Sequence, residues 1–131
     1  DGDSDRVVFV DEKGNWIVGD KGFAISAKRA VAGEKDRKGK FVVTTVATSR
    51  AVEEACAELG AKTIYTKVGA PYLSEKMAEL GLNAVSGGEE VGGIIWPRFS
   101  SAKDGIFAAA KIAEMVLFVR CSMIWSMSMS G

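Results

Sequence analysis

The sequence predicts an α/β domain in which a mixed, mostly parallel sheet is flanked by helices, giving three α/β/α layers. Three observations support this prediction. Short β-branched segments alternate with amphipathic helical segments, which is typical of parallel sheets. The 131 residues fit one ordinary domain. Glycine-rich or charged loops follow several predicted strands, and sheets of this class bind ligands in such loops.

The first part of the chain predicts a hairpin, a helix and a strand. Residues 7–10 and 16–18 are β-branched and aromatic, and turn-forming residues separate them. Asp20 is the expected N-cap of a helix that runs to Val31. Residues 40–46 form the next strand.

The second helix is predicted from apolar residues at positions i, i+3, i+4 and i+7, which are Val52, Ala55, Cys56 and Leu59. Thr48 and Ser49 are its expected caps, and Gly60 is its expected end. In the next helix, Pro71 suits the first turn and Gly81 the stop. The remaining predicted elements are strands at residues 63–65, 84–85 and 94–96 and a last helix at residues 104–119.

Composition excludes several classes of function. The 17 basic and 17 acidic residues cancel, so neither nucleic acid nor an anionic membrane is expected as the main partner. The two cysteines form no CxxC pair, which favours a reducing, cytoplasmic location over a disulfide framework. The sequence contains no histidine, the usual general base and the commonest zinc ligand. Neither a signal peptide nor a membrane span is expected, because the longest apolar stretch, residues 106–119, is too short.

An acidic loop opens the chain, directly before a predicted strand. Asp1, Asp3 and Asp5 alternate with other residues, so their carboxylates are able to converge on one hard cation such as Mg²⁺. Arg6 offers a fork for a phosphate oxygen. The alternatives are a solvated acidic terminus and a calcium loop of the EF-hand kind. The calcium loop fits poorly, because Arg6 stands where its glycine is required.

Two further loops carry polar residues at predicted strand ends. Lys67 follows a strand and faces the ligand crevice, although a surface lysine before a turn is the more common interpretation of this residue alone. Residues 87–93 place four glycines around Glu89 and Glu90. Flexible backbone lets a ligand approach closely and a carboxylate accepts two sugar hydroxyls, while the alternative is a mobile hairpin with solvated acids.

Taken together, the three loops resemble those of the α-D-phosphohexomutases, the phosphomannomutase/phosphoglucomutase family. Residues 1–6 match that family's DGDxDR metal loop in full. Residues 88–93 resemble its GExSG or GEENGG sugar loop, but Val91 replaces a polar residue and Gly93 replaces a frequent histidine. Residues 66–69 match a TKxG segment, and residues 103–105 are similar to an (R)DG element.

The resemblance implies a reversible transfer of phosphate between the 1- and 6-hydroxyls of a hexose, through a phosphoserine. Glucose and mannose 1- or 6-phosphate are the implied substrates. Asp1, Asp3 and Asp5 would hold Mg²⁺ against the phosphoserine, with Arg6 beside the phosphate and Lys67 near the reacting hydroxyl. The sugar would be bound by the third loop, through Gly88, Glu89, Glu90 and Gly92. Val91 cannot donate or accept a side-chain hydrogen bond there.

The family has four domains, and the resemblance covers the end of the second and the whole third, sugar-binding domain. We therefore expect residues 1–19 to form the metal loop and hairpin, 20–119 the third domain, and 120–131 a disordered or artefactual tail. No loop for a phosphoserine is found, so this polypeptide alone is expected to lack mutase turnover. Its apolar last helix, with Phe107, Met115 and Phe118, is expected to cause self-association.

Two alternatives stay open from the sequence. One is a non-catalytic module that binds a sugar phosphate or a partner through the same loops. The other is a structural metal-binding domain, which would bind Ca²⁺ more tightly than Mg²⁺ and show no effect of sugar phosphates.

Overall fold

The computed structural model describes residues 2–129, and it describes side chains from residue 2 to residue 118. Its centre is a four-stranded sheet in the order β4-β3-β5-β6, from β3 (Phe41–Thr45), β4 (Lys62–Thr66), β5 (Ala84–Gly88) and β6 (Ile94–Ile95). The first three of these strands are mutually parallel, and β6 is antiparallel to β5. The predicted mixed, mostly parallel sheet is confirmed.

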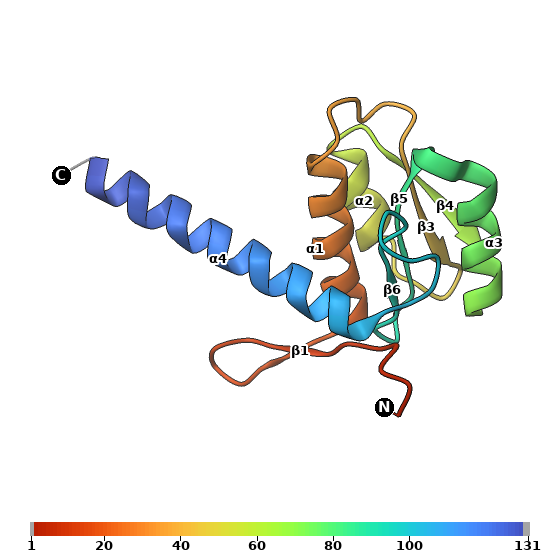
Figure 1. Cartoon of the computed structure of the whole chain (residues 1–131), viewed down its shortest axis with the longest axis horizontal. Coiled ribbons are helices and arrows are strands. Elements are labelled where there is room, and N and C mark those ends of the chain that lie inside the picture. The colour runs from red at the N-terminus through yellow and green to blue at the C-terminus, as the bar shows by residue number, and fades with distance from the viewer. Residues whose placement is uncertain (1, 130–131) are drawn as a thin grey trace.

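Helices cover both faces of this sheet (Figure 1). On one face lie α1 (Gly19–Ala32) and α2 (Ala51–Ala57), and on the other lies α3 (Ala70–Leu80), followed by the short 3-10 helix η1 (Gly81–Asn83). A separate two-stranded hairpin, β1 (Phe9–Val10) and β2 (Trp16–Ile17), precedes α1. The last helix, α4 (Gly105–Met129), begins near the hairpin and extends away from the sheet.

The core is divided between the two faces of β3. Val42 packs with Phe23 of α1 and Val52 of α2, whereas its neighbour Val43 packs with Leu73 and with other residues on the α3 side. All five side chains are fully buried, and each contributes about 1.5–3 kcal/mol by leaving water. The alternation of buried residues along β3 therefore fixes the three-layer architecture.

Helix ends differ from the predictions at several points. The helix α1 begins at Gly19 with Val18 as its N-cap, so Asp20 lies inside the first turn and does not cap it. The N-cap of α2 is Arg50, with no side-chain cap, because the hydroxyl of Thr48 is used elsewhere. Pro71 opens α3 as expected, and Gly81 follows its end with a positive φ of 55°.

The helix α4 is longer than predicted. It continues through residues 120–129, which we had expected to form a disordered tail. Those ten residues contain neither glycine nor proline, so nothing in the sequence stops a helix that has already formed. Residues 130–131 of the expected tail lie outside the described part of the chain.

Candidate active site

The predicted loops lie at one edge of the sheet, at the carboxyl ends of its parallel strands. The register pairs Thr45 with Thr66 and Thr44 with Gly88, so β3, β4 and β5 end side by side. Lys67 follows β4, and Glu89 follows β5. Any ligand bound at this edge would meet loops from three strands.

Glu89 is the most buried acidic side chain in this group of loops. Its residue is 5% exposed, and its Oε1 accepts a hydrogen bond of 2.6 Å from Nζ of Lys103. The same Nζ lies 3.2 Å from Oδ2 of Asp5 in the acidic loop. We call these three residues the carboxylate–lysine bridge. It joins the acidic loop to the glycine-rich loop through one ammonium group.

The bridge also sets the charge state of Lys103. Burial by itself would lower the pKa of Lys103, but hydrogen bonds to Glu89 and Asp5 and their negative charges raise it above the ordinary value. Lys103 is therefore positively charged at neutral pH. Two carboxylates from separate loops share that charge.

Backbone geometry holds the glycine-rich loop in a tight turn. The amide of Glu89 donates to the carbonyl of Gly93 at 3.0 Å, and the amide of Gly92 donates to the carbonyl of Glu89 at 3.2 Å. Gly92 has a φ of +94°, and a β-carbon there would lie 2.4 Å from the carbonyl oxygen of Val7. Glycine at this position thus allows both the turn and the close approach of Val7, which follows the acidic loop.

Glu90 points toward the end of β3. Its Oε2 accepts hydrogen bonds from the hydroxyls of Thr45 at 3.2 Å and Thr48 at 3.4 Å. Thr44, in turn, lies 2.8 Å from the Thr48 hydroxyl and donates to the carbonyl of Gly88 at 2.9 Å. The two adjacent glutamates therefore have different surroundings: one pairs with a lysine and the other with threonine hydroxyls.

Lys67 shares the edge of the sheet without joining the bridge. It is exposed after β4, and β3 separates β4 from β5. Its ammonium lies 5.9 Å from the ring centroid of Tyr72, a cation–π distance. A flexible, solvated lysine at this place is free to reach a ligand above the strand ends.

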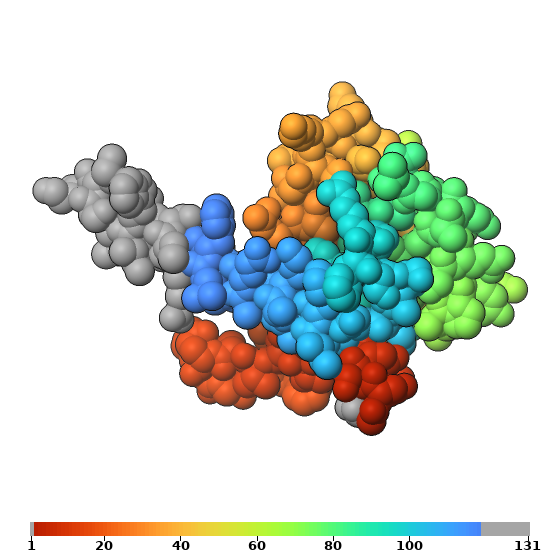
Figure 2. Space-filling model, in the orientation of Figure 1, coloured from red at the N-terminus to blue at the C-terminus, as the bar shows by residue number. Residues whose placement is uncertain are grey.

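The acidic loop lies against the start of α4 (Figure 2). The amide of Gly105 donates to the carbonyl of Ser4 at 2.9 Å, and Ser4 itself has a positive φ of 56°. Asp3 is exposed, and Nε of Arg6 lies 4.0 Å from Oδ1 of Asp5. Asp1 lies outside the described residues.

A magnesium ion in this loop stays a prediction, because the described residues contain no group of three metal-ligating side chains placed to hold one. Asp3 and Asp5 offer hard carboxylate oxygens, which Mg²⁺ prefers. The position of Asp5 already attracts a cationic group, because Lys103 pairs with it.

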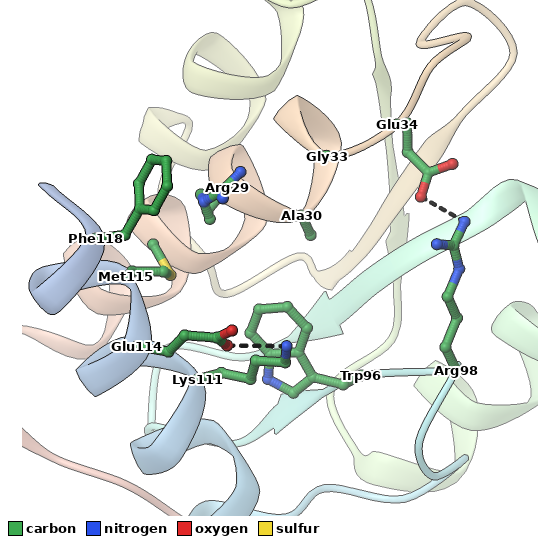
Figure 3. Close-up of a pocket in the computed structure, with 10 residues that line it drawn as sticks. All are labelled: Arg29, Ala30, Gly33, Glu34, Trp96, Arg98, Lys111, Glu114, Met115 and Phe118. Atoms are coloured by element: carbon green, nitrogen blue, oxygen red, sulfur yellow. Dashed lines mark hydrogen bonds and ion pairs between the residues drawn. The ribbon is translucent and has the colours of Figure 1, made fainter. Parts of the chain in front are cut away.

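The pocket between α1 and α4 lies elsewhere (Figure 3). Its volume is about 250 Å³, and four of the charged side chains that line it form two ion pairs: Arg98 with Glu34 at 2.5 Å and Lys111 with Glu114 at 3.0 Å. None of the predicted site residues lines it. The loops at the strand ends therefore remain the candidate active site.

Two kinds of site residue were missed in the sequence. The sequence predicts Lys103 only as part of a turn, since no local pattern shows that it reaches back to Glu89, 14 residues earlier. The sequence predicts Thr44 and Thr45 as strand residues alone. Their hydroxyls at the carboxyl end of a central strand were the available signal.

Comparisons with known proteins identify the fold and the family of this domain. A family model described as phosphoglucomutase/phosphomannomutase, alpha/beta/alpha domain III, matches residues 18–123. The chain belongs to the phosphoglucomutase/phosphomannomutase family. The phosphoglucomutase/phosphomannomutase of Thermococcus kodakarensis is 42% identical to it over 115 residues, which cover 88% of this chain and 24% of that protein. The phosphoglucosamine mutase of Thermodesulfovibrio yellowstonii is 39% identical over 116 residues, covering 88% and 25%.

Solved structures of the family have the same fold. A phosphoglucomutase/phosphomannomutase family protein from Burkholderia thailandensis superposes with a TM-score of 0.74 at 24% identity, covering 84% of this chain and 23% of that one. Parafusin, a phosphoglucomutase from Paramecium, superposes with a TM-score of 0.68 at 26% identity, covering 83% and 18%. The chain is thus domain III of a phosphohexomutase, and it spans about a quarter of the length of the curated relatives described above.

Among the described residues, no helix is both long enough and apolar enough to cross a membrane. The division of the chain at residues 19 and 119 remains a prediction.

Proposed function

We propose that this chain supplies the sugar-binding loop and part of the metal loop of an enzyme that interconverts hexose 1-phosphates and hexose 6-phosphates. The observation that carries the proposal is the setting of Glu89: its carboxylate is buried at the end of β5 and held by Lys103. A carboxylate fixed in this way is able to accept hydrogen bonds from two neighbouring hydroxyls of a sugar. Glucose, mannose and glucosamine phosphates all carry such hydroxyls.

In this proposal the acidic loop serves the phosphoryl group. Asp3 and Asp5, with Asp1, would hold Mg²⁺, which neutralises negative charge on a transferring phosphoryl group when bound. Arg6 would place its guanidinium beside the same phosphate, and Lys67 would bring a mobile positive charge toward the reacting hydroxyl. The phosphoserine would come from another part of the protein.

The proposal is tested by titrating the 131-residue chain with glucose 1-phosphate and following amide resonances. Signals from Glu89, Glu90 and Gly92 should move together. Glu89→Gln should weaken the binding about tenfold or more, because it removes a charge-assisted hydrogen bond. Glu114→Gln, on the exposed surface of α4, is the matched control and should bind like the wild type.

Equal affinity of the Glu89→Gln and wild-type chains would contradict the proposal. The purified chain should also show no conversion of glucose 1-phosphate to glucose 6-phosphate, and measurable turnover would show that no further part is required. A cytoplasmic location remains part of the proposal and agrees with the buried free thiol of Cys56.

Self-association is also part of the proposal. Of the three apolar residues singled out in the sequence, Phe107 stacks on Phe99 at 3.8 Å, whereas Phe118 is 62% exposed. Val116 and Leu117 beside it are also exposed. Sedimentation velocity at rising concentration should therefore show association, and a monomer throughout would contradict this expectation.

A further inference from the structure

Lys103 is fixed between two loops that the proposed function assigns to different ligands. Its side chain is 9% exposed, that of Glu89 is 7% exposed, and that of Asp5 is 27% exposed. The ammonium lies 2.6 Å from the Glu89 carboxylate and 3.2 Å from the Asp5 carboxylate. Its bond to Glu89 is thus the shorter and more buried one, and its bond to Asp5 is nearer to water.

The backbone around Lys103 leaves it little freedom to lie elsewhere. The amide of Asp104 donates to the carbonyl of Ile94 at 3.2 Å, and Oδ1 of Asp104 accepts from the amide of Phe107 at 2.8 Å, which caps the start of α4. The stem of Lys103 passes over Gly93, where a β-carbon would lie 2.2 Å from its Cδ. The fold therefore places this one ammonium between the two carboxylates.

We propose that Lys103 is the resident counter-ion of the acidic loop, which a divalent cation must displace from Asp5 in order to bind there. Once displaced, Lys103 pairs with Glu89 alone. Cation binding in the acidic loop therefore changes the charge environment of Glu89, the carboxylate proposed to bind the sugar. The inference rests on the proposed function for the identity of the cation. It rests on the distances above for the role of the lysine.

The physical reason is competition between two cations for one carboxylate. A magnesium ion binds a carboxylate oxygen at about 2.1 Å, and Nζ of Lys103 already lies 3.2 Å from Oδ2 of Asp5. A magnesium ion and an ammonium group bound to the same carboxylate would lie close together, and their positive charges would repel each other. A lysine that only joined the two loops would, when removed, loosen the acidic loop and weaken the metal site. A competing lysine would, when removed, strengthen it.

The test is a magnesium titration of the full 131-residue chain, without any sugar phosphate. Binding is followed through the amide resonances of Asp3, Asp5 and Arg6. In Lys103→Met, which keeps an apolar stem and removes the charge, the dissociation constant for Mg²⁺ should fall about three- to tenfold, corresponding to the worth of a partly exposed ion pair. Lys103→Arg keeps a cation and should restore the wild-type value.

Lys111→Met is the matched control, because Lys111, like Lys103, pairs with a glutamate, here Glu114, but does not contact the acidic loop. It should leave magnesium binding unchanged. A dispersed amide spectrum shows that each variant is folded, and Lys103→Gln replaces Lys103→Met should that variant not fold, with the same sign expected.

Unchanged or weaker magnesium binding in the folded, uncharged variant would overturn the inference. Absence of magnesium binding from both the wild type and that variant would overturn it as well. Failure of the proposed function appears separately, as a lack of glucose 1-phosphate binding at Glu89 in the other titration, and it leaves the magnesium comparison intact.

Discussion

The side chain of Lys103 occupies the space that a β-carbon on Gly93 would require. A β-carbon built there would lie 2.2 Å from Cδ of Lys103 and 3.1 Å from Oε1 of Glu89. The contact is with the middle of the lysine stem, so the side chain has to move, and Gly93→Ala should break the carboxylate–lysine bridge. We expect a loss of about 1–3 kcal/mol in the free energy of unfolding, measured by urea denaturation.

A double-mutant cycle shows how much of the cost of Gly93→Ala comes from its contact with Lys103 and how much from the backbone. In a Lys103→Ala background, Gly93→Ala should cost at least about 1 kcal/mol less than in the wild type, because its obstacle is gone. Additive losses would show that Gly93 and Lys103 do not compete for space.

Gly92 is the position where a side chain should do the most damage to the site. Its φ is +94°, and a β-carbon would meet the carbonyl oxygen of Val7 at 2.4 Å, beside the 3.0 Å hydrogen bond from Val7 to Gly92. Gly92→Ala should cost about 3 kcal/mol or more. Gly39 has a similar φ of +81° but open space around it, so Gly39→Ala should cost only about 1–2 kcal/mol. Thermal unfolding of both variants checks this difference, and equal losses would contradict it.

Val91 is the residue of the proposed sugar-binding loop at which a substitution should raise the affinity for sugar phosphate. It is 48% exposed, so Val91→Asn should change the free energy of unfolding by less than about 0.5 kcal/mol. The added amide supplies a hydrogen-bonding group at the turn, and the affinity for glucose 1-phosphate should rise about two- to tenfold. Val91→Thr, which keeps the branched shape, is a useful comparison. Unaltered affinity in Val91→Asn would place the bound sugar away from this side chain.

Cys56 should be an unreactive thiol in the folded protein. Burial raises the pKa of Cys56 from 9.0 to about 11. The second cysteine of the chain, Cys121, is first replaced by serine so that only Cys56 can react. A thiol reagent at pH 8 should then modify Cys56 slowly in the folded chain and rapidly in urea. Fast modification of the folded chain would show that α2 opens readily.

The same pKa shift gives a dependence of stability on pH. Between pH 9.0 and 11 the folded chain keeps the thiol proton that the unfolded chain loses, so the free energy of unfolding falls as the pH rises through this range. The decrease from this group reaches about 2–3 kcal/mol at most. It should be absent from Cys56→Ala, and subtracting the two pH profiles removes the effects of lysines and tyrosines.

The sequence predicts the layers of this fold well, because strand and helix periods are local properties. The valines of β3 and the stop at Gly81 lie where their patterns indicate. The helix caps were less predictable. Thr48 has the residue type of an N-cap, but its hydroxyl contacts Thr44 and Glu90, since three strand ends meet there. A tertiary contact thus outweighs a capping preference of about 1 kcal/mol.

The loops of the candidate site were predictable from the sequence, but the side-chain contacts between those loops were not. Glu89 and Asp5 each stand in a recognisable motif, yet only the folded chain shows that one lysine joins them. Asp20 illustrates the opposite error. Its type suggests a cap, but the N-cap of the helix is Val18, two residues earlier, and Oδ1 of Asp20 is buried without a partner among the described residues.

The hydrogen bond from the amide of Gly105 to the carbonyl of Ser4 links the segment between β6 and α4 to the acidic loop. A residue inserted between β6 and α4 would shift the first turn of the helix and carry the acidic loop with it. We therefore expect that a longer connection at this place requires a matching change within residues 2–6.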